Sequence, residues 1–223
     1  MKDFKFIVHK DAIDAGVVIR GVRISGVDNH SYPDSLNDYI RVHTDRLLEN
    51  TDNDVIKNDR ILNGFVELHK NVGIPKRKNP SAGENLLRAL VRKQSFHRIN
   101  PVVDIYNIIS MESRLALGAH DIDKVDGNIH LRLTDGSENY VPLGQEDSKP
   151  VKVGVYSYID DANDIVCYLE IRQVMKTLVD ENSTDLYFIV QGNQETSQSE
   201  VDQIAKELII VVTYYLGGKG ELL

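Results

Sequence analysis

The chain has 223 residues, of which 41% are hydrophobic and 27% are charged, a balance typical of a globular protein with a sizeable core. Its 34 acidic residues against 26 basic ones give a formal net charge of −8. Long-range attraction does not hold a protein of this charge on nucleic acid. The composition therefore excludes a general nucleic-acid coat protein, although it allows a local basic patch.

The single cysteine, Cys167, cannot form an internal disulfide and has no zinc-type Cys/His spacing around it. This excludes disulfide-rich secreted scaffolds and structural zinc domains. No window approaches the roughly 18 consecutive apolar residues that a transmembrane helix needs. The opening residues, MKDFKF, lack the apolar run of a signal peptide. We therefore expect a cytoplasmic protein with a reduced, buried thiol and no membrane partner.

The first elements in chain order are two short strands and then two helices. Residues 4–8 and 16–24 are rich in valine and isoleucine, and glycines flank the second run, which is typical of strands. Apolar residues then recur at helical spacing over 36–48 and over 55–69, on either side of a polar break at 50–54. These patterns predict two amphipathic helices after the strands.

Two further helices have clear starting signals. Ser81 and Glu84 have the S-x-x-E spacing of a capping box in front of an apolar run. Asn100 is followed by proline at the first helical position, and residues 100–110 are apolar nearly all round. We expect one helix to begin after Ser81 and a second, buried helix to begin after Asn100.

The C-terminal half is predicted to be rich in strands. Strand-like runs occupy 129–133, 140–143, 151–158, 165–171 and 186–191. A second capping box, Ser197 with Glu200, opens a helix that two glycines end after residue 216. Because helices and strands follow one another without a regular βαβ rhythm, the order predicts a layered α/β fold of the α+β kind rather than a doubly wound sheet.

A basic segment interrupts this acidic chain. Residues 70–98 carry eight basic residues and one acid, a local net charge of +7, while the remainder carries −15. Arg88 and Arg92 lie one turn apart and opposite the apolar face of their helix, beside the basic loop at 76–78. The segment is either a grip on a phosphate backbone or a solvated helix face.

No motif indicates a cofactor or a metal. Neither G-x-x-x-x-G-K-[ST] nor G-x-G-x-x-G occurs, so ATP-driven chemistry and a Rossmann cofactor have no support. The run at 120–127 resembles a calcium loop, but its third acid is one residue late and the closing glutamate is missing. We expect no metal site, no cofactor and no complete ligase.

Polar side chains in the apolar helix are candidate site residues. Asp104, in the first turn, suits the helix dipole and is predicted to be structural. Asn107, Ser110 and Glu112 either bind neighbouring backbone or line a pocket, because buried polar groups need partners.

The segment after this helix contains one adjacent pair of side chains suited to acid–base chemistry. His120 stands beside Asp121. The histidine is either an oriented acid or base or a polar surface residue in a loop.

Two runs carry a resemblance to a known family. Residues 102–107 read VVDIYN and match a V-V-D-x-x-N helix, and residues 121–127 read DIDKVDG and match D-L-x-K-x-x-G after a glycine-containing loop. The segment from Asn100 to Gly127 thereby resembles the B3/B4 domain of the phenylalanyl-tRNA synthetase beta subunit, and the likeness extends over most of residues 80–215. The other portions of that subunit have no room in 223 residues, so the chain is similar to free-standing B3/B4 proteins.

The resemblance implies a three-layer ββα sandwich in a single domain over 1–223, with N-terminal strands and helices at 1–79 and a B3/B4 core at 80–216. Because this domain houses the editing site of the synthetase, the resemblance also implies an aminoacyl-tRNA deacylase, a hydrolase acting on an ester bond. Its partner would be the aminoacylated acceptor end of tRNA, and no DNA is expected. Two positions depart from the family: Gly118 replaces a histidine implicated in editing, and His97 replaces an arginine.

On this resemblance the candidate site residues form three groups. The catalytic group has the backbone N–H groups of Gly118 and Ala119 for the ester carbonyl, and His120 and Asp121 to orient water. The substrate-binding group is Asn100, Asn107, Ser110, Glu112, Arg172 and Thr177. The RNA-binding group is Lys76, Arg77, Lys78, Arg88, Arg92, Lys93 and His97.

The two departures leave other functions open. One alternative is a non-catalytic RNA- or tRNA-binding module that keeps the fold and the basic segment. Another is a small-molecule protein or enzyme that binds an amino acid in the same pocket without RNA. Reversing Lys76, Arg77 and Arg88 to glutamate should abolish RNA binding by the deacylase and by the binding module, and should leave the small-molecule protein unaffected.

Overall fold

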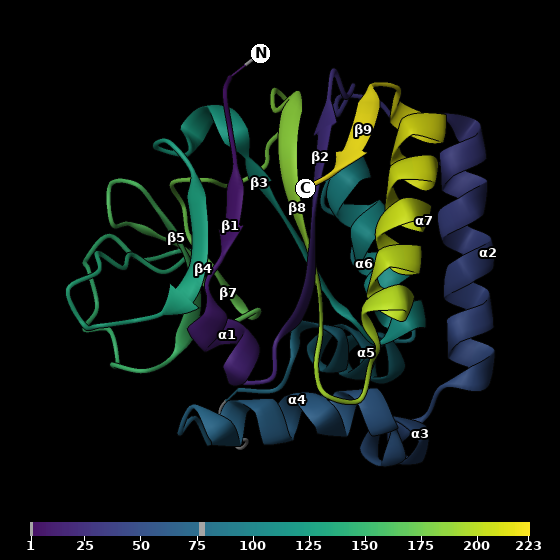
Figure 1. The fold of residues 1–223 in the computed structure, drawn as a ribbon. Helices are drawn as coiled ribbons and strands as arrows, with labels where there is room; N and C mark the ends of the chain where they lie inside the picture. Colours follow the sequence, from purple (N-terminus) through teal and green to yellow (C-terminus); the bar gives the residue numbers. More distant parts are fainter. Residues whose placement is uncertain (1, 76–78) are drawn as a thin grey trace.

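The structure, a computed structural model, describes residues 2–75 and 79–223 and contains two β-sheets that lie face to face (Figure 1). Sheet A contains, in spatial order, β1 (Phe6–Val8), β4 (Ile129–Leu133), β5 (Tyr156–Asp160), β6 (Ile165–Tyr168) and β7 (Arg172–Gln173). Sheet B contains β3 (Ala116–Asp121), β8 (Asp185–Gly192), β2 (Val18–Ser25) and β9 (Lys219–Leu222). The strand pairs are antiparallel except β1 with β4.

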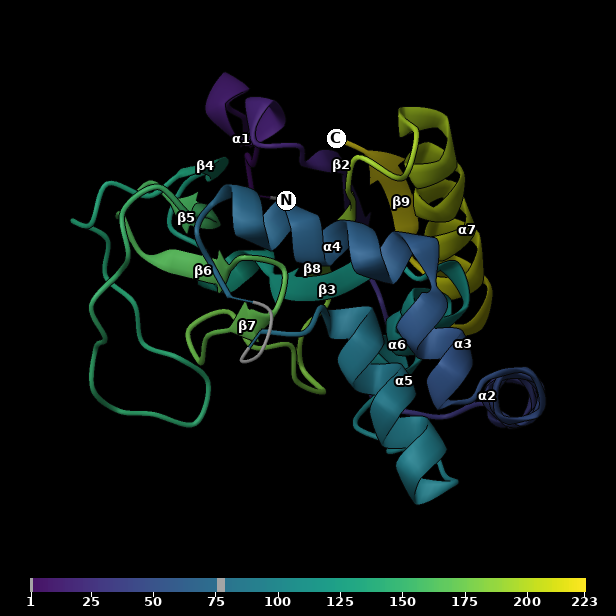
Figure 2. The same cartoon turned by 90° about the horizontal axis from the view of Figure 1, so that it is seen from below.

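Helices form a third layer and close one end of the molecule. They are α1 (Lys10–Asp14), α2 (Asp34–Asn50), α3 (Asn53–Asn58), α4 (Arg60–Asn71), α5 (Ala82–Lys93), α6 (Pro101–Ser113) and α7 (Gln198–Leu216), with a 3₁₀ turn at Ile122–Lys124. Helices α6 and α7 pack on sheet B, and α2 packs on α6. Helix α4 lies across the ends of both sheets (Figure 2). The predicted α+β, three-layer ββα sandwich is therefore confirmed. No helix in the described ranges has the length and apolar character needed to cross a membrane.

Strand β8 separates the two cores, and all of its residues are buried. Side chains alternate between the faces of a strand. Leu186, Phe188 and Val190 therefore face α6 and α7, while Tyr187 and Ile189 face sheet A. A strand with both faces covered is expected at the centre of a three-layer fold.

The predicted helix starts are confirmed. The Ser81 hydroxyl accepts the Glu84 backbone N–H, and the Asn100 side chain caps α6 in the same way. Ser197 forms a complete capping box. At Ser81 the Glu84 carboxylate instead accepts from Arg88, 2.8 Å away, so this box forms only in part. Helix α6 is buried from Pro101 through Met111, as its apolar composition predicts.

Some predicted strands were wrong in extent. Residues 140–143 form no strand, because Asn139 and Pro142 make only isolated bridges. The predicted strand at 151–158 begins at Tyr156, and the one at 165–171 ends at Tyr168. The short strands β7 and β9 were not predicted; β7 pairs with β6, and β9 pairs with β2. The short helix α1 was not predicted either.

Two further expectations were wrong. The helix predicted over 55–69 is two helices, because Asp59 caps α4 by accepting the N–H groups of Ile61 and Leu62. His120 lies in the buried strand β3 rather than in a surface loop, because the segment pairs with β8 on one edge.

The N-terminal residues contribute to both sheets. Strand β1 pairs with β4 of sheet A, and β2 pairs with β8 and β9 in sheet B. Residues on both sides of the predicted boundary between 79 and 80 therefore build each sheet.

Candidate functional site

A cavity of about 220 Å³, here called the β3 pocket, opens where β3 of sheet B faces β6 and β7 of sheet A. Helices α5 and α6 provide the other walls. Its lining is Ala82, Asn85, Leu86, Tyr106, Asn107, Leu117, Gly118, Cys167, Glu170, Ile171, Gln173 and Ile189. The pocket is thus assembled from segments more than a hundred residues apart, from Ala82 to Ile189.

The walls of the β3 pocket are mostly apolar, with carboxamides from two sides. Asn107 on α6 is predominantly buried, and Gln173 comes from β7. Burial raises the pKa of Tyr106 to about 12, and the Gln173 amide partly offsets this. Cys167 is buried as predicted, and burial raises the pKa of its thiol, so it remains protonated. These groups can bind a neutral polar ligand by hydrogen bonds.

Gly118 leaves space at the wall. A Cβ built there would lie 3.5 Å from Nε2 of Gln173, an ordinary contact distance. Alanine would therefore fit, whereas a branched side chain would extend into the pocket. This is the position where the family resemblance places a histidine.

The free edge of β3 presents backbone donors beside the pocket. Asp121 donates its N–H to the carbonyl of Thr177, 3.1 Å away and on the side opposite β8. Backbone groups of an antiparallel strand alternate between its two edges. The N–H groups of Leu117 and Ala119 therefore also face the edge opposite β8, whereas that of Gly118 faces β8.

His120 does not line the β3 pocket. Its imidazole is 1% exposed and stacks on Tyr187 between the two sheets. Nδ1 lies 2.9 Å from the Thr177 hydroxyl, and Nε2 has no partner within the described residues. Burial lowers the pKa of His120 to about 3, so the ring is neutral at pH 7.

Asp121 also has structural partners. Its carboxylate accepts from the Ser183 hydroxyl at 2.6 Å and from the Asp123 backbone N–H at 3.1 Å. Lys124 lies 3.2 Å away. This carboxylate fixes the turn after β3 and lies outside the lining of the pocket.

Three predicted substrate-binding residues have structural partners instead. Asn100 caps α6 and donates to the carbonyl of Val179, 3.3 Å away. The Ser110 hydroxyl donates to the carbonyl of Leu115 at 2.6 Å. Thr177 holds His120, as described above. Of the predicted substrate-binding group, the β3 pocket therefore contains Asn107.

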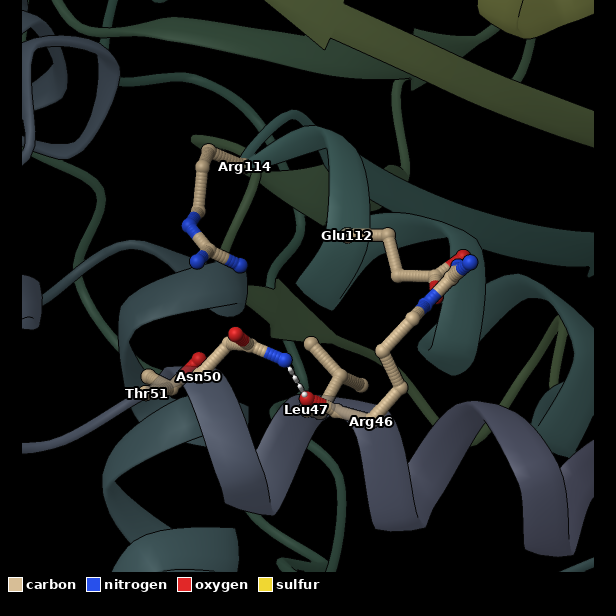
Figure 3. Close-up of a pocket in the computed structure, with 6 residues that line it drawn as sticks. All are labelled: Arg46, Leu47, Asn50, Thr51, Glu112 and Arg114. Atoms are coloured by element: carbon tan, nitrogen blue, oxygen red, sulfur yellow. Dashed lines mark hydrogen bonds and ion pairs between the residues drawn. The ribbon is translucent and has the colours of Figure 1, made fainter.

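Glu112 lies in a different cavity, of about 250 Å³, between the C-terminal ends of α2 and α6 (Figure 3). Its carboxylate lies 2.8 Å from Nδ1 of His43 and also pairs with Arg46. Figure 3 shows Glu112 and Arg46 directed toward each other, while Arg114 lies at the other end of the cavity. Arg114 pairs with Asp59, 3.3 Å away, so each charged side chain that lines this cavity already has an ion-pair partner.

The predicted RNA-binding residues lie mainly on and beyond α5. Arg92, Lys93 and His97 are exposed. Arg88 is also exposed but pairs with Glu84 at 2.7 Å. Lys76, Arg77 and Lys78 lie outside the described residues. Arg172, predicted to bind substrate, is exposed and donates to the Asn79 side chain at 2.9 Å.

Sequence reasoning missed a buried polar network behind the pocket. His69 on α4 is 1% exposed, and its Nε2 lies 2.8 Å from a carboxylate oxygen of Glu170. The other oxygen accepts from the Tyr156 hydroxyl, while Nδ1 of His69 donates to the carbonyl of Asn79. Glu170 contributes to the pocket wall, but its side chain is fully buried. No spacing signal connects residues 69 and 170.

One acidic cluster has the spacing of metal ligands. Oxygens of Asp126, Asp160 and Asp164 lie within 4.8 Å of one another. The Lys176 ammonium, however, lies 2.7 Å, 2.7 Å and 2.6 Å from these three carboxylates. The lysine therefore takes the place that a cation would occupy.

Comparison with known proteins gives consistent results. A family model described as the B3/4 domain matches residues 70–207. The phenylalanine–tRNA ligase beta subunit of Mycoplasma genitalium is 27% identical over 127 residues, which are 56% of this chain and 15% of that protein. An N-terminal fragment of the phenylalanyl-tRNA synthetase beta subunit from Pyrococcus horikoshii shares the fold over 99% of this chain and 51% of its own, with a TM-score of 0.50 and 13% identity.

Proposed function

Because this chain belongs to the B3/4 domain family, we propose that it binds the acceptor end of an aminoacylated tRNA and hydrolyses the ester of a mischarged amino acid. The curated relative is named as a ligase that charges tRNA with phenylalanine, which supports tRNA as the partner. The chain spans only 15% of that relative, so the ligase reaction itself is not part of the proposal.

The observation that carries the proposal is that α5 both lines the β3 pocket and ends in exposed basic residues. Ala82, Asn85 and Leu86, in its N-terminal half, line the β3 pocket. Arg92 and Lys93, in its last turn, are exposed cations. One helix thus places positive charge within two to three turns of a cavity of amino-acid size. A tRNA end has the matching features, an anionic backbone leading to a small aminoacyl group.

The pocket offers a route for ester hydrolysis. Water attacks the carbonyl carbon, the backbone N–H group of Leu117, a residue that lines the pocket, stabilises the oxyanion, and the carbon–oxygen bond to the ribose breaks. A hydroxyl of the same ribose accepts a proton from the attacking water and passes its own proton to the leaving ribose oxygen. The Asn107 amide binds the aminoacyl group. His120 and Asp121 hold β3 in place through Thr177 and Ser183 in this scheme.

Deacylation of a panel of aminoacylated tRNAs tests the proposal. The purified protein should release one or a few amino acids faster than a control without protein. Gly118→Val should slow release about 100-fold, because a branched side chain displaces the ester from the donors. Gly118→Ala, whose Cβ makes only ordinary contacts, is the matched control and should keep most of the activity.

Binding of tRNA is tested separately. Reversing both Arg92 and Lys93 to glutamate should weaken binding and lower its dependence on salt, since each lost phosphate contact reduces the slope of log K against log salt by about 0.7–0.9. Reversing Lys206 and Lys219, which are exposed on α7 and β9, makes the same change in net charge elsewhere. Equal loss in both proteins would contradict an interface on α5. Tight binding without ester release would favour the non-catalytic module.

A further inference from the structure

Two histidines converge on the outer face of sheet A, away from the β3 pocket. His9 follows β1, His130 lies in β4, and these strands are paired with Ile7 opposite His130. Nε2 of His9 lies 3.0 Å from Nδ1 of His130. Both side chains are partly exposed, and no role in the proposed hydrolysis falls to them.

We propose that His9 and His130 form a binding site for a late first-row divalent metal ion, of the class of Zn²⁺, Ni²⁺ and Cu²⁺. Imidazole nitrogens are preferred ligands of these ions. With metal–nitrogen bonds of about 2.05 Å, two nitrogens 3.0 Å apart subtend about 95° at the ion. This is close to the angle between neighbouring ligands in octahedral and square-planar complexes, and a slight separation of the rings gives the tetrahedral angle.

A carboxylate orients the second ring for metal binding. Nε2 of His130 lies 2.8 Å from Oδ1 of Asp161. Both the backbone N–H and the side-chain amide of Asn128 donate to Oδ2 of Asp161 at 2.9 Å, which fixes the carboxylate. With the His130 proton held on Nε2, Nδ1 accepts the Nε2–H of His9 in the ion-free protein. The ion takes the place of that hydrogen when His9 adopts the tautomer with its proton on Nδ1. This is the carboxylate–histidine arrangement found behind metal ligands in proteins.

The surroundings leave room for the remaining ligands. The His130 side chain is 26% exposed and Asp161 is 43% exposed, so water reaches this face of the sheet. Water supplies the other coordination positions, as in sites with few protein ligands. The cluster of Asp126, Asp160 and Asp164 differs from this site, because the Lys176 ammonium already lies between its carboxylates.

Titration calorimetry with ZnCl₂ and NiCl₂ on the metal-stripped 223-residue chain tests the site. One ion should bind per chain, and MgCl₂, which prefers oxygen ligands, should give no heat at the same concentration. His130→Gln should abolish binding of both ions. Asp161→Asn should weaken it about 10- to 100-fold, as expected for a group that orients a ligand. His30→Gln, at an exposed histidine elsewhere, should bind as the parent protein does.

A thermal melt shows that loss of binding is not loss of folding. His9 makes no side-chain capping bond to α1, so His9→Gln should keep the fold while losing the ion. The parent protein should melt at a higher temperature with Zn²⁺ than without it, and folded His9→Gln and His130→Gln proteins should show no such rise. Zn²⁺ binding that survives either substitution would overturn the proposal.

Discussion

His120 and His69 are equally buried, each with 1% of its surface exposed, yet their surroundings shift their pKa values in opposite directions. Burial lowers the pKa of His120 to about 3, and its partners among the described residues, the Thr177 hydroxyl and the Tyr187 ring, carry no charge that would oppose this. Burial also opposes the charge on His69, but the charge and hydrogen bond of Glu170 outweigh it, and the net effect is a raised pKa.

The difference teaches that the partner of a buried histidine decides its charge. His120 is uncharged at pH 7, and its ring packs between the two sheets. His69 forms a buried ion pair that connects α4 to the loop between β6 and β7, directly behind the β3 pocket. A catalytic role for His120 would require water at its ring, whereas the His69–Glu170 pair supports the pocket wall, to which Glu170 belongs.

The largest expected effect is a loss of unfolding free energy in acid, caused by His120. The unfolded chain protonates His120 near pH 6.5, while the folded chain does so only near pH 3. Between these values the unfolded state binds more protons, so stability falls as pH falls, by up to about 5 kcal/mol. Urea unfolding of the parent protein and of His120→Leu from pH 7 to pH 3 measures this loss as the difference between the two proteins, because carboxylates with lowered pKa values, such as Asp180, also lose stabilising contacts in acid. His120→Leu should remove most of it, and His30→Gln should leave it unchanged.

Breaking the ion pair should have the next largest effect. Glu170→Ala leaves the Tyr156 hydroxyl and Nε2 of His69 unpaired in the interior, at a cost of about 4 kcal/mol of unfolding free energy. Glu67→Ala, on the exposed face of α4, should change stability by less than about 0.5 kcal/mol. A similar small change at both positions, measured by urea unfolding, would mean that the pair contributes little.

The ion pair should also give stability a second dependence on pH. Since the pKa of His69 is raised in the folded state, its contribution is complete below about pH 6.5 and is lost as pH rises through the folded value. The slope cannot exceed about 1.4 kcal/mol per pH unit for one proton. His69→Gln should flatten this alkaline limb without altering the acid limb of His120.

Thr177→Val should have the smallest effect. It removes the hydroxyl that binds Nδ1 of His120 and should reduce unfolding free energy by about 1 kcal/mol. The ring stays buried, so an NMR titration should still find His120 neutral well below pH 6. A His120 signal that titrates near its ordinary pKa in this variant would show that the hydroxyl, and not burial, keeps the ring neutral.

The local parts of the fold were predictable from sequence. Ser81 and Asn100 predict the starts of their helices because each capping bond joins residues three positions apart. The VVDIYN run indicated the family that the comparison confirms. The resemblance assigned Asn107 and Gly118 to one site, and both line the β3 pocket.

The remaining features depend on contacts between distant segments. His120 looked like a loop residue because its partners, Thr177 and Tyr187, come from segments about sixty residues away. Glu112 was predicted to bind substrate, but its carboxylate pairs with His43 and Arg46 of α2. No local spacing predicts which distant side chain satisfies a polar group, and this limited the prediction of the site.

The strand order of sheet B has a consequence for synthesis. Its neighbours are β3 with β8, β8 with β2, and β2 with β9, so every pair joins strands distant in the chain. Such contacts form slowly, because long loops must close first. Strand β2, at residues 18–25, emerges from the ribosome early but has no partner strand until residues 185–192 are made. Both of its hydrogen-bonding edges stay open during that interval, which makes β2 the segment most in need of protection from aggregation in the growing chain.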